Sequence, residues 1–200
     1  MRQIIRGCVE KGVKHLTLYA FSTENWKRPK AEIDGLMSIL ELYLDKELEE
    51  LCREGVRIHH IGRVEAMPEQ TRKKLEHSIE VTCHNSALIL HLAWNYGGRD
   101  EIIYVIQQML RDKVQPEKVN EALVDQYLFT AGVPDPDLII RTSGEMRVSN
   151  FLIWQAAYSE WYFTPTLWPD FDKDELFKAI EIFGRRERRF GALSSSDHEN

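Results

Sequence analysis

The sequence is poor in cysteine, has no long hydrophobic run and carries no excess of positive charge. Its three cysteines, Cys8, Cys52 and Cys83, are far apart and include no C-x-x-C pair, which argues for a reducing, cytoplasmic setting without a zinc site. The longest apolar stretches, around residues 87–90 and 151–154, fall far short of the roughly 18 residues of a membrane span. No charged N-terminus followed by an apolar run is present, so no signal peptide is expected.

The net charge of −6 argues against general binding of nucleic acid. The arginines are nevertheless clustered, and local arginine clusters in an acidic protein indicate a discrete anionic ligand. Four of them crowd the end of the last expected helix and two flank a glycine-containing segment: Arg185, Arg186, Arg188 and Arg189, then Arg141 and Arg147.

Hydrophobic periodicity predicts helices that alternate with short strands along the 200 residues. This alternation is typical of a single α/β domain, here residues 1–191, with a mostly parallel central sheet and helices on both faces. Residues 192–200 are expected to form a disordered tail. The expected helices span residues 2–11, 33–52, 68–84, 100–111, 119–129, 150–158 and 173–188, and the strands span 15–21, 56–61, 87–94, 137–141 and 161–163.

Polar residues gather where these strands end, which is where parallel sheets bind ligands. The richest segment covers residues 141–150, in which Arg141 and Arg147 could hold a phosphate together with the N–H groups of the helix expected to follow. The alternative is a loop whose arginines simply pair with Glu145. Both interpretations remain open from the sequence.

The segments after two other strands also allow two interpretations each. After the first strand, Asn25 could orient or accept a proton and Arg28 could hold an anion, or Ser22 and Thr23 could cap a turn while Trp26 fills a core edge. After the third strand, the glycines of 97–99 could form an anion-binding nest or an ordinary turn.

The long helix at 33–51 is apolar over more than one stripe, which indicates either deep burial or a second face that lines a tunnel or a dimer contact. The histidines show no metal-ligand spacing. His59 and His60 lie on opposite faces of one strand, and His91 is expected to be a core histidine with its hydrogen bonds satisfied.

Three long segments resemble the cis-prenyltransferases, of which undecaprenyl diphosphate synthase is the most similar type. They are Thr17–Pro29 (TLYAFSTENWKRP), Asn95–Arg99 (NYGGR) and Asp137–Phe151 (DLIIRTSGEMRVSNF), and the likeness continues to RERRFG at 186–191. The resemblance implies Mg²⁺-dependent condensation of isopentenyl diphosphate onto an allylic diphosphate such as farnesyl diphosphate, with each new double bond cis. It also implies a homodimer, a hydrophobic tunnel for the growing chain, and a lipid product compatible with peripheral membrane contact.

The resemblance assigns roles residue by residue. Asn25, assisted by Arg28, would remove the proton of isopentenyl diphosphate, and Glu160 would help to bind the metal. The remaining family positions would contact substrate: Ser22, Thr23, Glu24 and Trp26 in one loop, Arg141, Arg147, Val148 and Ser149 in another, and Arg189 and Gly191 of the R-x-G motif near the C-terminus. Met146 replaces a histidine of some relatives and receives no metal role, because a thioether is a poor Mg²⁺ ligand.

Nothing like the family's opening strand and D-G-N-G-R loop occurs in this sequence. We therefore expect a truncated record of an active enzyme, inactive or weak as it stands, with unpaired strand edges. A non-catalytic partner subunit is the alternative, although the retained Asn25, Arg141 and Glu160 favour the enzyme. A phosphate-ester hydrolase is disfavoured because no nucleophile is evident.

Overall fold

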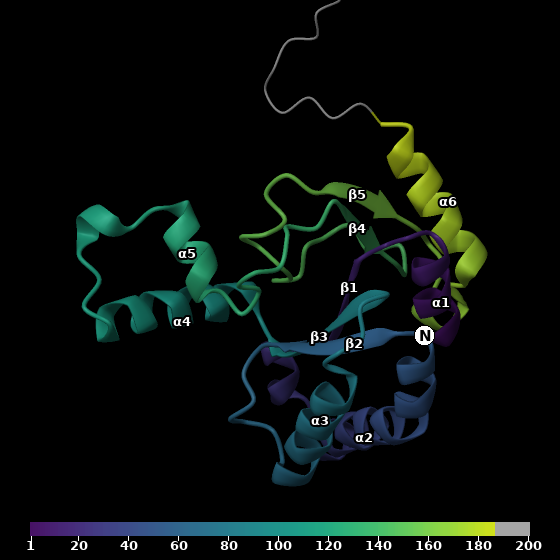
Figure 1. Ribbon diagram of the computed structural model, residues 1–200, viewed down its shortest axis with the longest axis horizontal. Helices are drawn as coiled ribbons and strands as arrows, with labels where there is room; N and C mark the ends of the chain where they lie inside the picture. The colour runs from purple at the N-terminus through teal and green to yellow at the C-terminus, as the bar shows by residue number, and fades with distance from the viewer. Residues whose placement is uncertain (187–200) are drawn as a thin grey trace, which may run out of the picture.

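The computed structural model describes residues 1–186 and has the α/β architecture expected from the sequence. Helices and strands alternate along most of the chain (Figure 1). The helices are α1 (Arg2–Glu10), α2 (Lys30–Arg53), α3 (Glu69–Thr82), α4 (Gly98–Arg111), α5 (Glu121–Tyr127) and α6 (Lys173–Gly184), and the strands are β1 (His15–Ser22), β2 (Val56–Ile61), β3 (Leu88–Tyr96), β4 (Leu138–Arg141) and β5 (Glu160–Phe163).

All strand pairs in the described residues are parallel, and they form two sheets rather than one. The first sheet has the order β1-β3-β2, and the second pairs β4 with β5. Within residues 1–186, β1 and β4 are therefore each paired along one edge only. The carboxyl ends of β1 and β3 lie side by side, since Ser22 is in register with Tyr96, and this edge carries the polar segments singled out in the sequence.

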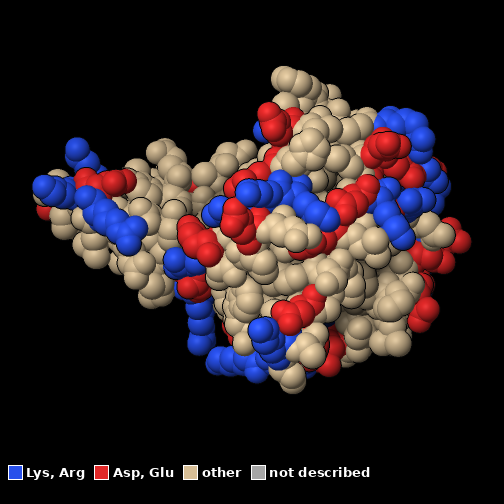
Figure 2. All heavy atoms as spheres, turned by 90° about the horizontal axis from the view of Figure 1, so that it is seen from below, with Lys and Arg blue, Asp and Glu red and all other residues tan. Residues whose placement is uncertain are grey.

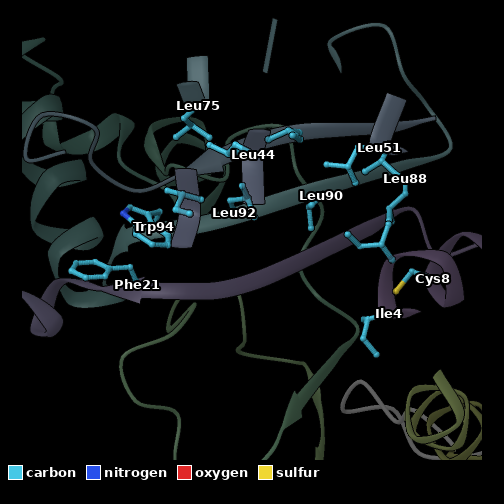
Figure 3. Packing of buried hydrophobic residues seen from close by; sticks show 14 of the residues in the cluster. Ile4, Cys8, Phe21, Leu44, Leu51, Leu75, Leu88, Leu90, Leu92 and Trp94 are labelled. Atoms are coloured by element: carbon cyan, nitrogen blue, oxygen red, sulfur yellow. The ribbon is translucent and has the colours of Figure 1, made fainter. Parts of the chain in front are cut away.

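The main core lies between the three-stranded sheet and the helices α2 and α3 (Figure 3). Alternate residues of the central strand, Leu88, Leu90 and Leu92, point to this side and are almost fully buried. They meet Leu44 from α2 and Leu75 from α3. A strand flanked on both edges and packed by two helices needs this near-continuous apolar sequence.

Helices α4 and α5 pack against each other and project away from the sheets as an arm (Figure 1). A small cluster of Val105, Met109 and Leu128 holds the arm together. The opposite side of α4 exposes Ile103, Ile106 and Leu110, with 72% of Leu110 accessible to solvent.

The helix expected at 150–158 is wrong, because the structure forms turns over this segment. Asn150 and Leu152 both have positive φ angles, 61° and 45°, and left-handed residues at these positions prevent regular helical hydrogen bonding. The expected helix at 173–188 ends at Gly184 in the described chain, and positions 187–188 lie outside the described residues.

Candidate active site

The segment after β1 forms one turn of 3₁₀ helix, Thr23–Lys27, closed by a capping box. The backbone N–H of Ser22 donates to Asn25 Oδ1 at 2.8 Å, and the Ser22 side chain accepts from the Asn25 backbone. The Trp26 ring lies edge-on to Phe21, with the ring centroids 5.1 Å apart. The capping and core-edge interpretation of this segment is thus confirmed for Ser22 and Trp26, and the cap fixes the orientation of the Asn25 amide.

Asn150 joins the three polar segments. Its backbone oxygen accepts the N–H of Gly98 at 2.7 Å, and its Oδ1 accepts the N–H of Arg99 at 2.8 Å. Its Nδ2 donates to Glu24 Oε1 at 2.6 Å. Gly97 is the N-cap and Gly98 the first residue of α4, and because Asn150 occupies the N–H groups of Gly98 and Arg99, the glycine pair forms neither an anion-binding nest nor an ordinary turn.

The close approach of these segments depends on Gly97. A Cβ at this position would lie 2.5 Å from Thr23 Oγ1 and 2.8 Å from Asn150 Nδ2. A larger residue here would force the Thr23 hydroxyl and the Asn150 amide to turn away, whereas the φ angle of Gly97 is an ordinary extended −158° that does not itself need glycine.

A cavity of about 570 Å³ opens where the segments meet. Residues from the loops after β1 and β4 line it together with residues of the 150–156 turns and of β5. The lining residues are Glu24, Arg99, Val148, Asn150, Ile153, Ala156 and Trp161. Two residues expected to contact substrate, Glu24 and Val148, thus share one cavity although they are far apart in sequence.

Two titratable groups at this edge have shifted pKa values. Burial of Glu24 opposes its ionisation, but hydrogen bonds from its own backbone, Asn150, Ser22 and Thr23 outweigh burial and lower its pKa. Burial and the nearby Glu24 charge raise the pKa of Tyr19 to about 12, against the opposing effect of Arg141. The Tyr19 hydroxyl donates to the backbone oxygen of Tyr96 at 3.2 Å, and its ring stacks on Phe151.

The arginines fall into two groups. Arg141, at the end of β4, has a buried Nε with no hydrogen-bond partner among the described residues. Arg147 is ion-paired with Glu145, and Arg28 donates to Glu32 at 2.6 Å. The simple-pairing alternative is thus confirmed for Arg147, whereas Arg141 has an unused donor in a place where an unpaired buried donor is costly.

Glu160, the expected metal ligand, begins β5 and accepts a hydrogen bond from Arg186 Nη1 at 2.6 Å. In the described part of the chain no three Asp, Glu, His or Cys side chains gather into a metal-binding group. Mg²⁺ commonly binds through one or two carboxylates and substrate phosphates, so a single carboxylate oriented by an arginine fits its chemistry. The expected substrate contacts Arg189 and Gly191, and the tail at 192–200, lie outside the described residues.

Sequence reasoning missed three residues that organise this edge: Tyr19, Asn95 and Asn150. All three lie within the segments that carried the resemblance, but their role depends on contacts across 69 to 130 positions. The tunnel that the resemblance implies beside α2 stays a prediction. Leu40 and Leu44 are buried in the core, whereas Ile39 is 64% exposed, and no residue of α2 lines the cavity.

Comparison with known proteins identifies the class of this α/β chain. The prenyltransferase family model, described as undecaprenyl diphosphate synthase, matches residues 1–191. The chain belongs to this family. It is 51% identical over 197 residues to an isoprenyl transferase of Clostridium tetani and 48% identical to one of Heliobacterium mobile, covering 96% of this chain and 77% and 76% of those proteins. At the level of the family it is therefore a prenyltransferase.

Solved structures support the same assignment. The structure superposes on a probable undecaprenyl diphosphate synthase from Campylobacter jejuni with a TM-score of 0.88 and 40% identity, covering 96% of this chain and 90% of that one. It matches lavandulyl diphosphate synthase from Lavandula x intermedia, solved in complex with dimethylallyl diphosphate, with a TM-score of 0.91 and 33% identity over 96% and 84% of the two chains. Among the described helices, none combines the length and apolar character needed to cross a bilayer.

Proposed function

We propose that this chain condenses isopentenyl diphosphate onto an allylic diphosphate such as farnesyl diphosphate, forming a long-chain cis-polyprenyl diphosphate. Family membership supports the reaction class. The observation that supports the substrate class is Arg141 at the carboxyl end of a parallel strand, whose buried Nε has no hydrogen-bond partner within residues 1–186. A guanidinium in that position matches the oxygens of a diphosphate.

The polar segments after β1 and β4 would have different roles in this reaction. Arg141, Arg147, Ser149 and the backbone of Val148 would hold isopentenyl diphosphate, with Arg147 exchanging Glu145 for phosphate. The double bond of isopentenyl diphosphate attacks the first carbon of the allylic chain, and the allylic carbon–oxygen bond breaks to release inorganic diphosphate. A proton then leaves the adjacent carbon, and Asn25, whose amide is oriented by Ser22, would assist its removal.

The other loop residues complete the site. Ser22, Thr23, Glu24 and Trp26 would shape the substrate-binding side of the cavity, and Arg28 would support the diphosphate. Glu160 would hold Mg²⁺ together with substrate oxygens, with Arg186 orienting the carboxylate. The bound ion supplies charge neutralisation for the leaving diphosphate.

The test compares Arg141→Ala with Arg72→Ala. Arg72 in α3 also has a buried Nε without a hydrogen-bond partner among the described residues, although that Nε lies 3.7 Å from Glu76 Oε1, and Arg72 lies on a helix and not at the end of a strand. Incorporation of labelled isopentenyl diphosphate into product is measured with farnesyl diphosphate and Mg²⁺. We expect wild type and R72A to turn over, and R141A to bind isopentenyl diphosphate at least about tenfold more weakly, as for loss of a charge-assisted hydrogen bond.

Equal binding by R141A and wild type would contradict the role of Arg141. A folded wild-type chain that binds isopentenyl diphosphate but never turns over would instead favour the non-catalytic partner subunit. Product length is read from the same assay by chromatography of the extracted lipid.

We also propose a cytoplasmic homodimer built on the arm. The exposed row Ile103, Ile106 and Leu110 on α4 has the i, i+3, i+7 spacing of a helix contact face. Acidic and basic side chains are interspersed on the face shown in Figure 2, without a continuous basic surface that would draw the protein to nucleic acid. Sedimentation of Leu110→Glu tests the dimer, because a monomeric wild type or a dimeric variant would contradict it.

A further inference from the structure

Asn95 occupies an irregular position at the end of β3. Its φ angle is 53°, in the left-handed region, and the register between β1 and β3 shifts here, since Phe21 is opposite Trp94 and Ser22 is opposite Tyr96. Only 3% of Asn95 is exposed. Among residues other than glycine, asparagine is one of the few that adopts this conformation readily.

The backbone and one end of the Asn95 side chain are tied to the turn after β2. The Arg63 N–H donates to the Asn95 backbone oxygen at 3.2 Å, and Asn95 Nδ2 donates to the Arg63 backbone oxygen at 2.9 Å. This reciprocal pair fixes the side-chain amide in one orientation, which settles that Oδ1 faces the other way.

Asn95 Oδ1 accepts a hydrogen bond from Trp26 Nε1 at 2.7 Å. This contact is specific, because the other indole nearby, that of Trp94, has a buried Nε1 without a partner in residues 1–186. The Asn95–Trp26 bond thus attaches the 3₁₀ turn to the sheet at a residue directly after Asn25. Together with the Ser22 cap and the Glu24–Asn150 bond, it holds the turn at three points.

We propose that Asn95 is a positioning residue that sets the location of Asn25 by anchoring Trp26. The expected effect on kcat rests on the proposed function, whereas the hydrogen bond between Asn95 and Trp26 does not depend on it. Proton removal depends on the placement of the assisting group, so a turn that shifts by a fraction of an ångström slows the chemical step more than it weakens binding.

The left-handed backbone allows a matched pair of variants. Asn95→Gly keeps the conformation and removes both side-chain bonds, whereas Asn95→Asp keeps an oxygen that accepts the indole N–H and loses only the donor to Arg63. Trp26→Phe removes the N–H from the other side of the indole bond. If the Trp26 bond mediates the effect, N95G and W26F combined should cost no more than N95G alone.

The indole N–H resonance of Trp26 is followed by ¹⁵N NMR, assigned by its disappearance in W26F, and steady-state kinetics are measured with isopentenyl diphosphate. We expect N95G to move this resonance upfield and to lower kcat about tenfold with little change in KM, the size expected for one hydrogen bond. N95D should stay closer to wild type than N95G in both readouts, because it keeps the acceptor for Trp26 and loses only the bond to Arg63. An N95G variant with an unmoved resonance or wild-type kcat, or an N95D variant whose indole resonance moves as far as that of N95G, would overturn the proposal.

The two proposals fail separately. If wild type shows no turnover, the proposed function fails, and the NMR shift together with hydrogen exchange of residues 22–28 still decides whether Asn95 anchors the turn. If wild type turns over and N95G does so with the same kcat, only the positioning role fails.

Discussion

The face of the three-stranded sheet that packs on α2 and α3 differs from the carboxyl ends of the same strands. Toward α2 and α3, β3 presents Leu88, Leu90 and Leu92, which are buried and apolar. At its carboxyl end, a few residues further on, the backbone turns left-handed at Asn95, and Ser149 and Asn150, in the loop that binds the start of α4, are left-handed as well. Apolar packing supplies the stability that allows this strained backbone to persist, and allows the buried Nε of Arg141 at the end of β4 to remain without a hydrogen-bond partner among the described residues.

The largest effect is expected in the core. Leu90→Ala should lower the free energy of unfolding by about 3–5 kcal/mol, because Leu90 is 0% exposed between the sheet and the two helices and its removal leaves a cavity. Urea unfolding followed by circular dichroism measures the loss. Leu42→Ala, at a 51% exposed leucine of α2, is the control and should change stability by less than about 0.5 kcal/mol. Similar losses for both variants would mean that the core is not where the stability resides.

The core side of the fold could be predicted from the sequence because its information is local. Alternating or continuous apolar residues specify a strand or a helix wherever they occur, and β2 was predicted with the bounds that the structure shows, Val56–Ile61. The helix prediction for residues 150–158 was wrong because it, too, relied on local information alone. The apolar residues of this segment have helical spacing, but contacts of Asn150 with Glu24 and with the start of α4 impose left-handed backbone on it.

The candidate site could be predicted only as a set of segments. Polar residues after the strands indicated one edge of the sheet, and Glu24 and Val148 do meet there at one cavity. The pairing of Arg147 with Glu145 was one of two interpretations open from the sequence, because this pair, like Arg28 with Glu32, is local in sequence. The partners of Trp26 and Asn150, in contrast, are nonlocal and could not be foreseen.

The face of β3 opposite the leucine core is buried like the core but carries polar side chains like the site. His91 is buried, as expected, with its two ring nitrogens each 3.0 Å from another imidazole, those of His15 and His59. Burial, reinforced by the charges of His59, His15 and Arg57, lowers the pKa of His91 to about 3. The sheet thus carries a neutral imidazole chain on one face and a hydrocarbon core on the other.

This face should make the fold sensitive to acid. Between about pH 6.5 and 3, His91 binds a proton in the unfolded state but not in the folded state, so the free energy of unfolding falls as the pH falls. From pH 6.5 to about pH 4.5, wild type should lose about 2 kcal/mol more than His91→Gln, as for one proton. Urea titrations across this range provide the measurement. Parallel pH profiles for the two proteins would show that His91 is protonated in the folded state too.

The smallest effect on stability, with a clear effect on activity, is expected at the site. Gly97→Ala would place a Cβ 2.5 Å from Thr23 Oγ1 and 2.8 Å from Asn150 Nδ2, so the Thr23 hydroxyl and the Asn150 amide must turn away, which disturbs the contact between the loop after β1 and Asn150 while the core stays intact. We expect the melting temperature to fall by only a few degrees and turnover to fall about tenfold or more, since small displacements of assisting groups are costly. Gly35→Ala in α2 is the matched control, because no atom lies within 4 Å of its Cβ and alanine there should stabilise the helix by about 0.5–1 kcal/mol. A G97A variant with full turnover would mean that the close contact of these segments does not affect the chemical step. The site would then tolerate small displacements as well as an exposed surface does, and its contrast with the core would be one of stability alone.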